Sequence, residues 1–218
     1  MIRFLRSNNC FLLPFYLFLI ASVIAISITP KVNFELWLNG FHNEFFDQLF
    51  KGATFIGNGW FFFLVALFIL ISNIAQGLAL GIIGGVVSLV SGICKHLFFA
   101  NTPRPLTFIH DHSSIHLVDG VIPLYTNSFP SGHTMSAFAL CFFVSILFKK
   151  KWFSTIMFFV ALAVGISRMY LMQHFLLDVF AGSILGVLIV SFLFPLLSKN
   201  ILNNTKLNRP LFRYEKKH

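Results

Sequence analysis

A histidine and an aspartate four residues apart, His174 and Asp178, have the spacing of a catalytic pair. Residues four apart on a helix share a face, so the aspartate can accept a hydrogen bond from one imidazole nitrogen. The other nitrogen is then left with a free lone pair and can act as a nucleophile, as in catalytic triads. Alternatively, the two residues form a buried polar contact that only holds helices together, and the spacing favours neither interpretation.

Residues 129–134, Phe-Pro-Ser-Gly-His-Thr, have the features of a helix start that binds an anion. Pro130 ends any preceding helix, and Ser131 is a good N-cap residue. Free N–H groups at a helix N-terminus attract anions, and Gly132 would allow close approach. His133 would then lie at the mouth of the pocket. The alternative is an ordinary capped helix start.

Three cationic side chains are candidates for holding an anion near this helix start. Arg104 lies in Thr-Pro-Arg-Pro, where flanking prolines restrict the backbone, while Arg168 and Lys95 end apolar stretches. Three cations beside free N–H groups describe a phosphate pocket. The alternative is that these long side chains extend to lipid headgroups, which suits Lys95 best and Arg104 least.

The composition indicates what kind of fold must position these residues. Of 218 residues, 57% are hydrophobic and 11% charged, whereas a soluble domain carries about 25% charged residues. We therefore expect a membrane protein. The net charge of +9 does not indicate nucleic-acid binding, because Lys and Arg fall in short segments between apolar stretches. Cys10, Cys94 and Cys141 form no CxxC pair and are expected to be small buried side chains.

Six apolar stretches approach the length of about 20 residues that a helix needs to cross a bilayer. They are residues 11–29, 53–72, 75–94, 131–148, 152–172 and 175–197. The sequence predicts an all-α fold, a polytopic bundle of six transmembrane helices, with residues 1–198 as one membrane domain and 199–218 as a basic cytoplasmic tail. No small-residue cleavage site follows the first stretch, so we expect it to be retained. Residues 42–59 mix aromatic and charged side chains and predict an interfacial helix that leads into the second span.

Small residues indicate close helix packing. Gly182 and Gly186 have GxxxG spacing in the sixth stretch, and the third stretch carries a stripe of glycine and serine between Gly81 and Gly92. Such faces let helices approach closely in lipid. Packing within one chain is the favoured interpretation and dimerisation the alternative, so the oligomeric state stays open.

The distribution of Lys and Arg predicts the orientation in the membrane. The N-terminus, residues 149–151 and the segment after residue 198 together hold 11 of the 16 basic residues. Six spans put these regions on one side, which we expect to be the cytoplasm. The candidate catalytic and cationic residues then converge at the opposite, non-cytoplasmic face, and ionisable residues near membrane helices are usually functional.

These residues resemble the three motifs of the type 2 phosphatidic acid phosphatase superfamily, which also includes the vanadium haloperoxidases. The motifs are a Lys followed after six residues by Arg-Pro, then Pro-Ser-Gly-His, then Ser-Arg-x5-His-x3-Asp. Residues 130–133 match the second motif and residues 167–178 match the third completely. In the first motif, eight residues rather than six separate Lys95 from Arg104. Two extra residues would turn Lys95 by about 200° on an unbroken helix, so we expect a bulge or loop in residues 98–103.

The resemblance implies a role for each matching position. His174 would attack phosphorus, His133 would protonate the leaving oxygen and then help water to hydrolyse the phosphohistidine, and Asp178 would orient His174. The residues implied to hold the phosphoryl oxygens are Lys95, Arg104, Arg168, Ser131 and Gly132, the last through its N–H. No metal or cofactor is expected, because cations and backbone donors supply the charge stabilisation. A neutral His174 with a protonated His133 implies a bell-shaped dependence of activity on pH.

A polar cluster in the long loop could suggest zinc. It consists of His110, Asp111, His112 and His116, but its spacing fits no common ligand pattern. We interpret the cluster as a solvated edge of the loop that could contact a substrate headgroup.

The predicted function is hydrolysis of a lipid-linked phosphate monoester or diphosphate by an enzyme of the bacterial inner membrane. Its active site would face the periplasm or exterior, with both termini in the cytoplasm. Phosphatidate, phosphatidylglycerol phosphate, polyprenyl diphosphate and lipid A phosphates all fit. A lipid phosphotransferase is the alternative, because the motifs do not distinguish water from another acceptor. A non-enzymatic transporter is more remote, and a haloperoxidase more remote still because those relatives are soluble.

Overall fold

The computed structural model describes residues 7–109, 111 and 115–212, and every regular element within these residues is helical. This confirms the predicted all-α fold. The α-helices are α2 (Asn9–Ile28), α3 (Asn33–Asn39), α4 (Glu44–Ile56), α5 (Gly59–Ser72), α6 (Ile74–Ile93), α7 (Gly132–Phe148), α8 (Lys151–Tyr170) and α9 (Leu176–Leu197). Two short π-helices, η1 (Cys94–Phe98) and η4 (Ser198–Leu202), extend α6 and α9, and η2 (Pro105–Phe108) is a 3-10 turn.

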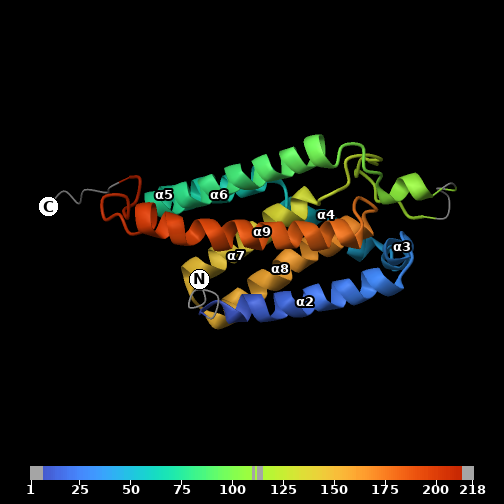
Figure 1. The fold of residues 1–218 in the computed structure, drawn as a ribbon, viewed down its shortest axis with the longest axis horizontal. Coiled ribbons are helices and arrows are strands. Elements are labelled where there is room, and N and C mark those ends of the chain that lie inside the picture. The colour runs from blue at the N-terminus through green and yellow to red at the C-terminus, as the bar shows by residue number, and fades with distance from the viewer. Residues whose placement is uncertain (1–6, 110, 112–114, 213–218) are drawn as a thin grey trace.

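The helix α7 is the centre of the bundle and contacts α5, α6, α8 and α9 (Figure 1). Most of its side chains are apolar and they occur on every face, and Met135, Phe138 and Phe142 are fully buried. A helix that is apolar all round is buried on all sides. The ring of Phe11 in α2 packs 4.9 Å from that of Phe142 and 5.8 Å from that of Phe158 in α8. These rings join α2 to the central helix.

Four helical segments of the described chain are long and apolar enough to cross a membrane: Asn9–Ile28, Ile74–Phe98, Lys151–Tyr170 and Leu176–Leu202. The bent pair of α4 and α5 adds a fifth if it forms one span, while α7, with 17 residues, is shorter. Leu13, Leu17 and Phe68 are examples of large apolar side chains exposed on the outside of the bundle. Such a surface is expected to face lipid. The chain is therefore an integral membrane protein, with four or five clear spans where six were predicted.

The predicted second span, residues 53–72, is broken in the structure. Helix α4 ends at Ile56 and α5 begins at Gly59, with an angle of 58° between them. The side chain of Asn58 accepts a hydrogen bond from the Trp60 N–H at 2.9 Å and so starts a new helix. The apolar run is continuous, but the capping residue within it redirects the chain.

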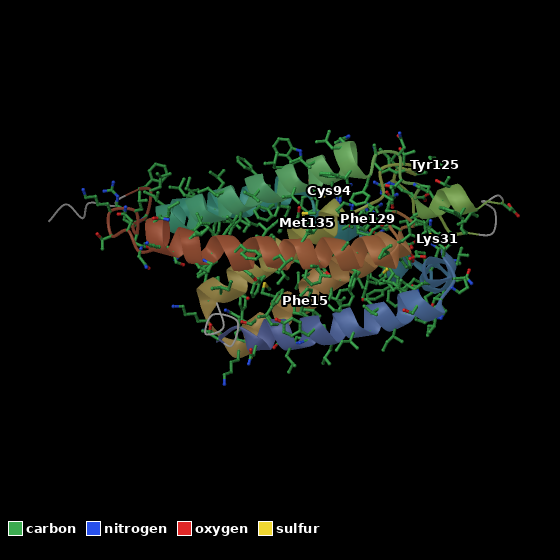
Figure 2. All side chains as sticks on the ribbon, in the orientation of Figure 1. Phe15, Lys31, Cys94, Tyr125, Phe129 and Met135 are labelled. Carbon is green, nitrogen blue, oxygen red and sulfur yellow. The ribbon has the colours of Figure 1, made fainter. Side chains whose placement is uncertain are left out.

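Three segments that the sequence placed on one side of the membrane lie together in the structure. Residues from the N-terminus, the α7–α8 connection and the C-terminal segment meet at one end, where Asn8, Lys150 and Asn203 line the same cavity of about 610 Å³. The loops that precede α7 lie with α3 at the other end (Figure 1). Lys31 and Tyr125 mark this second end in Figure 2. Arg3 and Arg6, used in the orientation argument, lie outside the described residues.

Part of the predicted basic tail packs against the bundle. The contact is at the start of α6, which Asn73 alone joins to α5, in agreement with the short turn expected there. The N–H groups of Ile74 and Ala75 donate to the carbonyls of Arg209 and Leu207 at 3.0 and 3.1 Å. The segment therefore caps α6, while residues 213–218 lie outside the described chain.

Two glycines of α9 allow close contact with α7. A Cβ on Gly182 would lie 2.6 Å from the carbonyl oxygen of Ser131, and one on Gly186 would lie 2.5 Å from that of Met135. The GxxxG pair thus serves packing within the chain, which is the favoured prediction. Because Ser131 directly precedes α7, this contact brings the starts of α7 and α9 together.

Helix α3 packs against the start of α9. The buried Glu35 accepts a hydrogen bond from the Leu176 N–H at 2.8 Å. This bond satisfies one of the free N–H groups in the first turn of α9.

Candidate active site

His174 lies in the connection between α8 and α9, and not on a helix as its spacing suggested. Helix α8 ends at Tyr170 and α9 begins at Leu176, so only Asp178 of the pair is helical. The Asp178 Oδ2 atom turns back over the helix start and accepts a hydrogen bond from the Phe175 N–H at 3.0 Å. The same oxygen lies 3.2 Å from His174 Nδ1. The pair therefore forms across the N-terminus of α9 rather than along a helix face.

The hydrogen bonds of His174 define its tautomer. Arg104 Nη1 lies 3.3 Å from His174 Nε2, and because a guanidinium can only donate, Nε2 acts as the acceptor. Nδ1 then carries the proton and donates to Asp178. Burial and then the nearby positive charges, that of Arg168 first, lower the pKa of His174 well below its ordinary value of 6.5. The imidazole is therefore neutral near pH 7 with a lone pair on Nε2, which is the state of a nucleophile.

Asp178 is held by two groups of the segment that leads into α7. The hydroxyl of Ser128, which sequence reasoning did not identify, donates to Asp178 Oδ2. The backbone carbonyl of Asp178 accepts a hydrogen bond from the Ser131 N–H at 3.1 Å. With the contacts to His174 and Phe175, these bonds fix both the carboxylate and the helix that carries it.

Ser131 is the N-cap of α7, as predicted. Its Oγ lies 2.8 Å from Thr134 Oγ1 and 3.4 Å from the Thr134 nitrogen, and its own N–H is bonded to Asp178. The hydroxyl thus already has partners within the first turn of the helix. A contact between Ser131 and phosphate stays a prediction.

Lys95 reaches the start of α7 despite its longer spacing from Arg104. It lies in η1, where the Phe99 N–H bonds to the carbonyl of Cys94, five residues earlier, at 2.8 Å. This π-helical turn is wider than an α-helical one, and the chain then leaves the helix. The expected irregularity therefore starts earlier than residues 98–103. A Cβ on Gly132 would lie only 3.9 Å from Lys95 Nζ, which places the ammonium beside the N-terminus of α7.

His133 is the second residue of α7 and lies within electrostatic reach of Arg168 and His174. Its imidazole makes no hydrogen bond within the part of the chain that the structure describes. The ring is therefore available to exchange a proton with a ligand at the helix start.

Arg104 is buried and held by backbone carbonyls. Its Nε donates to Thr126 at 2.7 Å, its Nη1 to Gln173 at 2.6 Å and its Nη2 to Asn127 at 3.1 Å. The guanidinium thus ties the loop before α7 to the residue that precedes His174. These bonds orient Arg104 without neutralising its charge.

Arg168 is buried with part of its guanidinium unpaired. Nη1 donates to Thr54 Oγ1 at 2.5 Å, and Nη2 lies 3.5 Å from Gln173 Oε1. Nε has no partner among the described residues. A buried N–H without an acceptor is costly, and an anion bound beside Arg168 would satisfy it.

The site carries an excess of positive charge. Lys95, Arg104 and Arg168 lie near His174, and none of the three forms an ion pair with any residue that the structure describes. Asp178 is the carboxylate that faces this group, and it bonds to the imidazole. Two of these cations, Arg104 and Arg168, are buried and Lys95 is half-buried. Buried cations without an ion-pair partner are stabilised by an anionic ligand.

One described residue of the predicted polar cluster in the long loop, His116, contacts helix α4. His110 and His112 lie outside the described residues. His116 Nε2 lies 2.8 Å from Asp47 Oδ2 in α4, and its ring stacks on His42 at 4.4 Å. This residue is therefore bonded to α4 while its side chain stays partly exposed. Within the described chain, no three His, Cys, Asp or Glu side chains are placed to hold a metal ion.

A family comparison agrees with the site. A model described as the PAP2 superfamily matches residues 75–202, more than half of the chain, and the match spans η1, α7 and the His174–Asp178 pair. The chain belongs to the PAP2 superfamily. This confirms the resemblance seen in the three motifs, and the PAP2 segment coincides with the helices that carry the site.

Two crystal structures share the PAP2 fold of this chain. LpxE from Aquifex aeolicus aligns with a TM-score of 0.67 and 26% identity, over 77% of this chain and 96% of that protein. A transmembrane PAP2-type phosphatidylglycerolphosphate phosphatase from Bacillus subtilis aligns with a TM-score of 0.59 and 22% identity, over 88% of this chain and 98% of that protein.

A curated relative is similar in sequence over a shorter segment. The bacitracin transport permease protein BcrC from Bacillus licheniformis is 45% identical over 69 residues, which is 31% of this chain. The match spans about a third of that relative, 32% of its length.

The structure thus brings the predicted residues of the PAP2 motifs to one end of the bundle and adds three others. Gln173 adjoins His174 and Ser128 lies just before the Pro-Ser-Gly-His motif, so their position in the sequence was a usable signal. Thr54 lies on a different helix, and no sequence pattern connects it to Arg168.

Proposed function

We propose that this protein hydrolyses a lipid-linked phosphate monoester or diphosphate through a covalent phosphohistidine. The observation that carries the proposal is the excess of positive charge around a neutral imidazole that is hydrogen-bonded to a carboxylate. A phosphate group supplies the missing negative charge and brings its phosphorus within reach of His174 Nε2. The unpaired Nε of Arg168 is a ready donor for one of its oxygens.

The proposed reaction has two steps. In the first, His174 Nε2 attacks phosphorus, the bond from phosphorus to the leaving oxygen breaks, and His133 gives that oxygen a proton. Asp178 stabilises the positive imidazole ring that results. In the second, water attacks the phosphohistidine and gives a proton to His133, which releases inorganic phosphate and restores Nε2. The cations and the N–H groups of α7 stabilise the phosphoryl oxygens, so the mechanism needs neither a metal ion nor a cofactor.

A cavity beside the site supports a substrate with a lipid tail. It has a volume of about 480 Å³ and extends from Ser128 and Asp178 to Ala25 and Ile26 of α2. Most of its lining side chains are apolar, as expected of a pocket that receives a hydrocarbon group. Phosphatidate, phosphatidylglycerol phosphate, polyprenyl diphosphate and lipid A phosphates each combine a phosphate with such a group, and the proposal covers all four.

Two alternatives differ in what they predict for His174. A lipid phosphotransferase forms the same phosphohistidine but needs a second substrate to release the phosphoryl group. A transporter, which the name of one relative suggests, does not depend on a nucleophile at this position.

The test is release of inorganic phosphate by the purified protein from a panel of the four lipids. We expect release from at least one lipid, and a loss of about 10³-fold or more in His174→Ala, because removing a nucleophile removes the covalent route. His42→Ala, which alters a histidine outside the site, is the matched control. Equal rates in His174→Ala and the parent would rule out the mechanism. Phosphate loss from the lipid only when an acceptor is added would indicate the phosphotransferase.

We further propose that the site faces the non-cytoplasmic side of a bacterial inner membrane, with α7 and the bent α4–α5 pair completing six spans. Eleven of the 16 basic residues belong to the regions that meet at, or continue from, the opposite end of the bundle. The test is labelling of intact cells with a membrane-impermeant maleimide after the native cysteines are replaced by serine. Ile122→Cys, at the site end, should be labelled and Asn203→Cys should not. The reverse pattern would invert the orientation.

A further inference from the structure

Helix α4 reaches into the site although it carries none of the PAP2 motifs. Thr54 Oγ1 accepts a hydrogen bond from Arg168 Nη1 at 2.5 Å, across 114 residues of sequence. Gln173 Oε1 faces the other terminal nitrogen of the same guanidinium at 3.5 Å. The guanidinium is thus held from two sides while Nε stays unpaired.

The bend that follows α4 touches a second residue of the site. A Cβ on Gly57 would lie 2.7 Å from the carbonyl oxygen of His133, 2.9 Å from its Cβ and 2.7 Å from Val164 Cγ1. The bend between α4 and α5 is therefore in close contact with the first turn of α7. Two independent observations therefore place this segment against the site. One is the hydrogen bond from Arg168 in α8 to Thr54, and the other is the close approach of Gly57 to His133 in α7.

The two faces of α4 differ in what they contact. Phe45 and Phe55 are 70% and 54% exposed, so the outer face presents aromatic rings to the surroundings. Thr54 contacts α8 through Arg168. Thr54 lies between the apolar residues Ala53 and Phe55, and its hydroxyl is the group of α4 that bonds the buried Arg168.

We propose that Thr54 is a positioning residue, which holds Arg168 in the orientation that binds phosphate, and that α4 thereby forms part of the active site. This inference rests on the proposed function. An arginine side chain has many rotamers, and a cation without a bound anion has little to select one of them. The bond to Thr54 restricts the guanidinium before the ligand arrives, so less conformational entropy is lost on binding. Thr54 itself need not touch the substrate.

The test compares Thr54→Val, which keeps the shape but removes the hydroxyl, with Thr54→Ser, which keeps the hydroxyl. We expect Thr54→Val to lower kcat/KM by about tenfold or more, the effect of a lost hydrogen bond to a charged group, and Thr54→Ser to restore most of the loss. Thr155→Val is the matched control, because the Thr155 hydroxyl bonds to carbonyls of Cys10 and Lys151 away from the site.

A binding measurement separates positioning from folding and from catalysis. Inorganic phosphate should raise the unfolding temperature of the parent and of Thr155→Val, and raise that of Thr54→Val much less. If the parent hydrolyses no lipid yet shows this pattern, the proposed function fails and the role of Thr54 stands. If the parent is active, and Thr54→Val matches it in both kcat/KM and phosphate stabilisation, the role of Thr54 is wrong.

A double-mutant cycle covers the case in which Thr54→Val is poorly folded. In an Arg168→Lys background the bond from Nη1 is already lost, so Thr54→Val should cause little further loss of kcat/KM or of phosphate stabilisation. Additive losses in the two variants would show that Thr54 acts independently of Arg168 and would overturn the proposal.

Discussion

The Ser131 N–H donates a hydrogen bond to the backbone carbonyl of Asp178 at 3.1 Å. This bond joins the residue that caps α7 to the first turn of α9. The helix start proposed to bind phosphate is therefore linked directly to the residue whose carboxylate contacts His174. Their relative position depends on how closely α9 packs against α7.

Enlarging Gly182 should disturb this link. A Cβ there would meet the Ser131 carbonyl at 2.6 Å, so Gly182→Val has to push α7 away. Overpacking of this kind costs about 1–3 kcal/mol of stability, and a shift of about 1 Å in the site can cost on the order of 10²-fold in rate. Thermal unfolding and phosphate release measure the two effects. The control is Gly85→Ala in α6, where an added Cβ meets nothing within 4 Å. Parent-like activity of Gly182→Val would show that the site tolerates separation of the two helices.

Asp178→Asn should reduce kcat strongly and change KM little. An amide can donate to His174 Nδ1, which would stabilise the tautomer with its proton on Nε2 and remove the nucleophilic lone pair. The corresponding change in a serine-protease triad lowers kcat by about 10⁴-fold, and we expect a loss of about 10²–10⁴-fold here. Ser128→Ala removes one donor to the same carboxylate and should cost about tenfold. Steady-state kinetics on the preferred lipid measure both, and a larger loss in Ser128→Ala than in Asp178→Asn would contradict this ranking.

The acidic limb of the pH profile should lie below pH 6.5. Burial and the nearby cations lower the pKa of His174, so in the free enzyme the ring stays neutral until the pH falls well below the ordinary histidine value of 6.5. Activity is present above the lowered pKa and is lost as the pH falls through it. The measurement is kcat/KM against pH, which reports groups of the free enzyme. An acidic limb centred at or above pH 6.5 would mean that His174 is not the group that must be neutral.

Glu35→Gln should make stability less dependent on pH. Burial is the main reason why the pKa of Glu35 is raised above its ordinary value of 4.5. Folding therefore takes up a proton between pH 4.5 and the raised pKa, so this residue makes the protein less stable as the pH rises across that window. The glutamine side chain keeps an acceptor for the Leu176 N–H and carries no charge. Unfolding temperatures in detergent should favour Glu35→Gln over the parent increasingly as the pH rises above 4.5. A constant difference at all pH values would contradict the protonation argument.

The sequence predicted the parts of the site that are fixed by local chemistry. Pro130 and Ser131 are residues typical of a helix start, and Ser131 is the N-cap of α7 as predicted. The glycine and histidine that follow predict an anion site there. The i,i+4 pair was also read correctly as a contact but placed wrongly on a helix. Phe175 is the N-cap, so Asp178 is the third residue of α9 and can reach back to the residue before the cap.

The rest of the site depends on the tertiary structure. The bend at Asn58 is hidden because the apolar run continues through it, and only the cap hydrogen bond to Trp60 shows where one helix ends. The contact between Thr54 and Arg168 exists because α4 packs against α8. No local sequence pattern specifies this packing. The position of Lys95 needed the π-helical turn, whose hydrogen bonds span one residue more than those of an α-helix.

The shortness of α7 has a consequence for where the reaction takes place. Its 17 residues rise about 25 Å, whereas the hydrocarbon core of a bilayer is about 30 Å thick. In the proposed six-span topology, if Lys149 lies at one boundary of the hydrocarbon, the other end of the helix, which bears His133, would lie about 5 Å below the opposite boundary. On the proposed function, the phosphate of a lipid substrate would then have to move below the membrane surface, into the protein, to reach the site. Such a phosphate would lose water as it moves inward, and its attraction to the three cations would strengthen as the local dielectric constant falls.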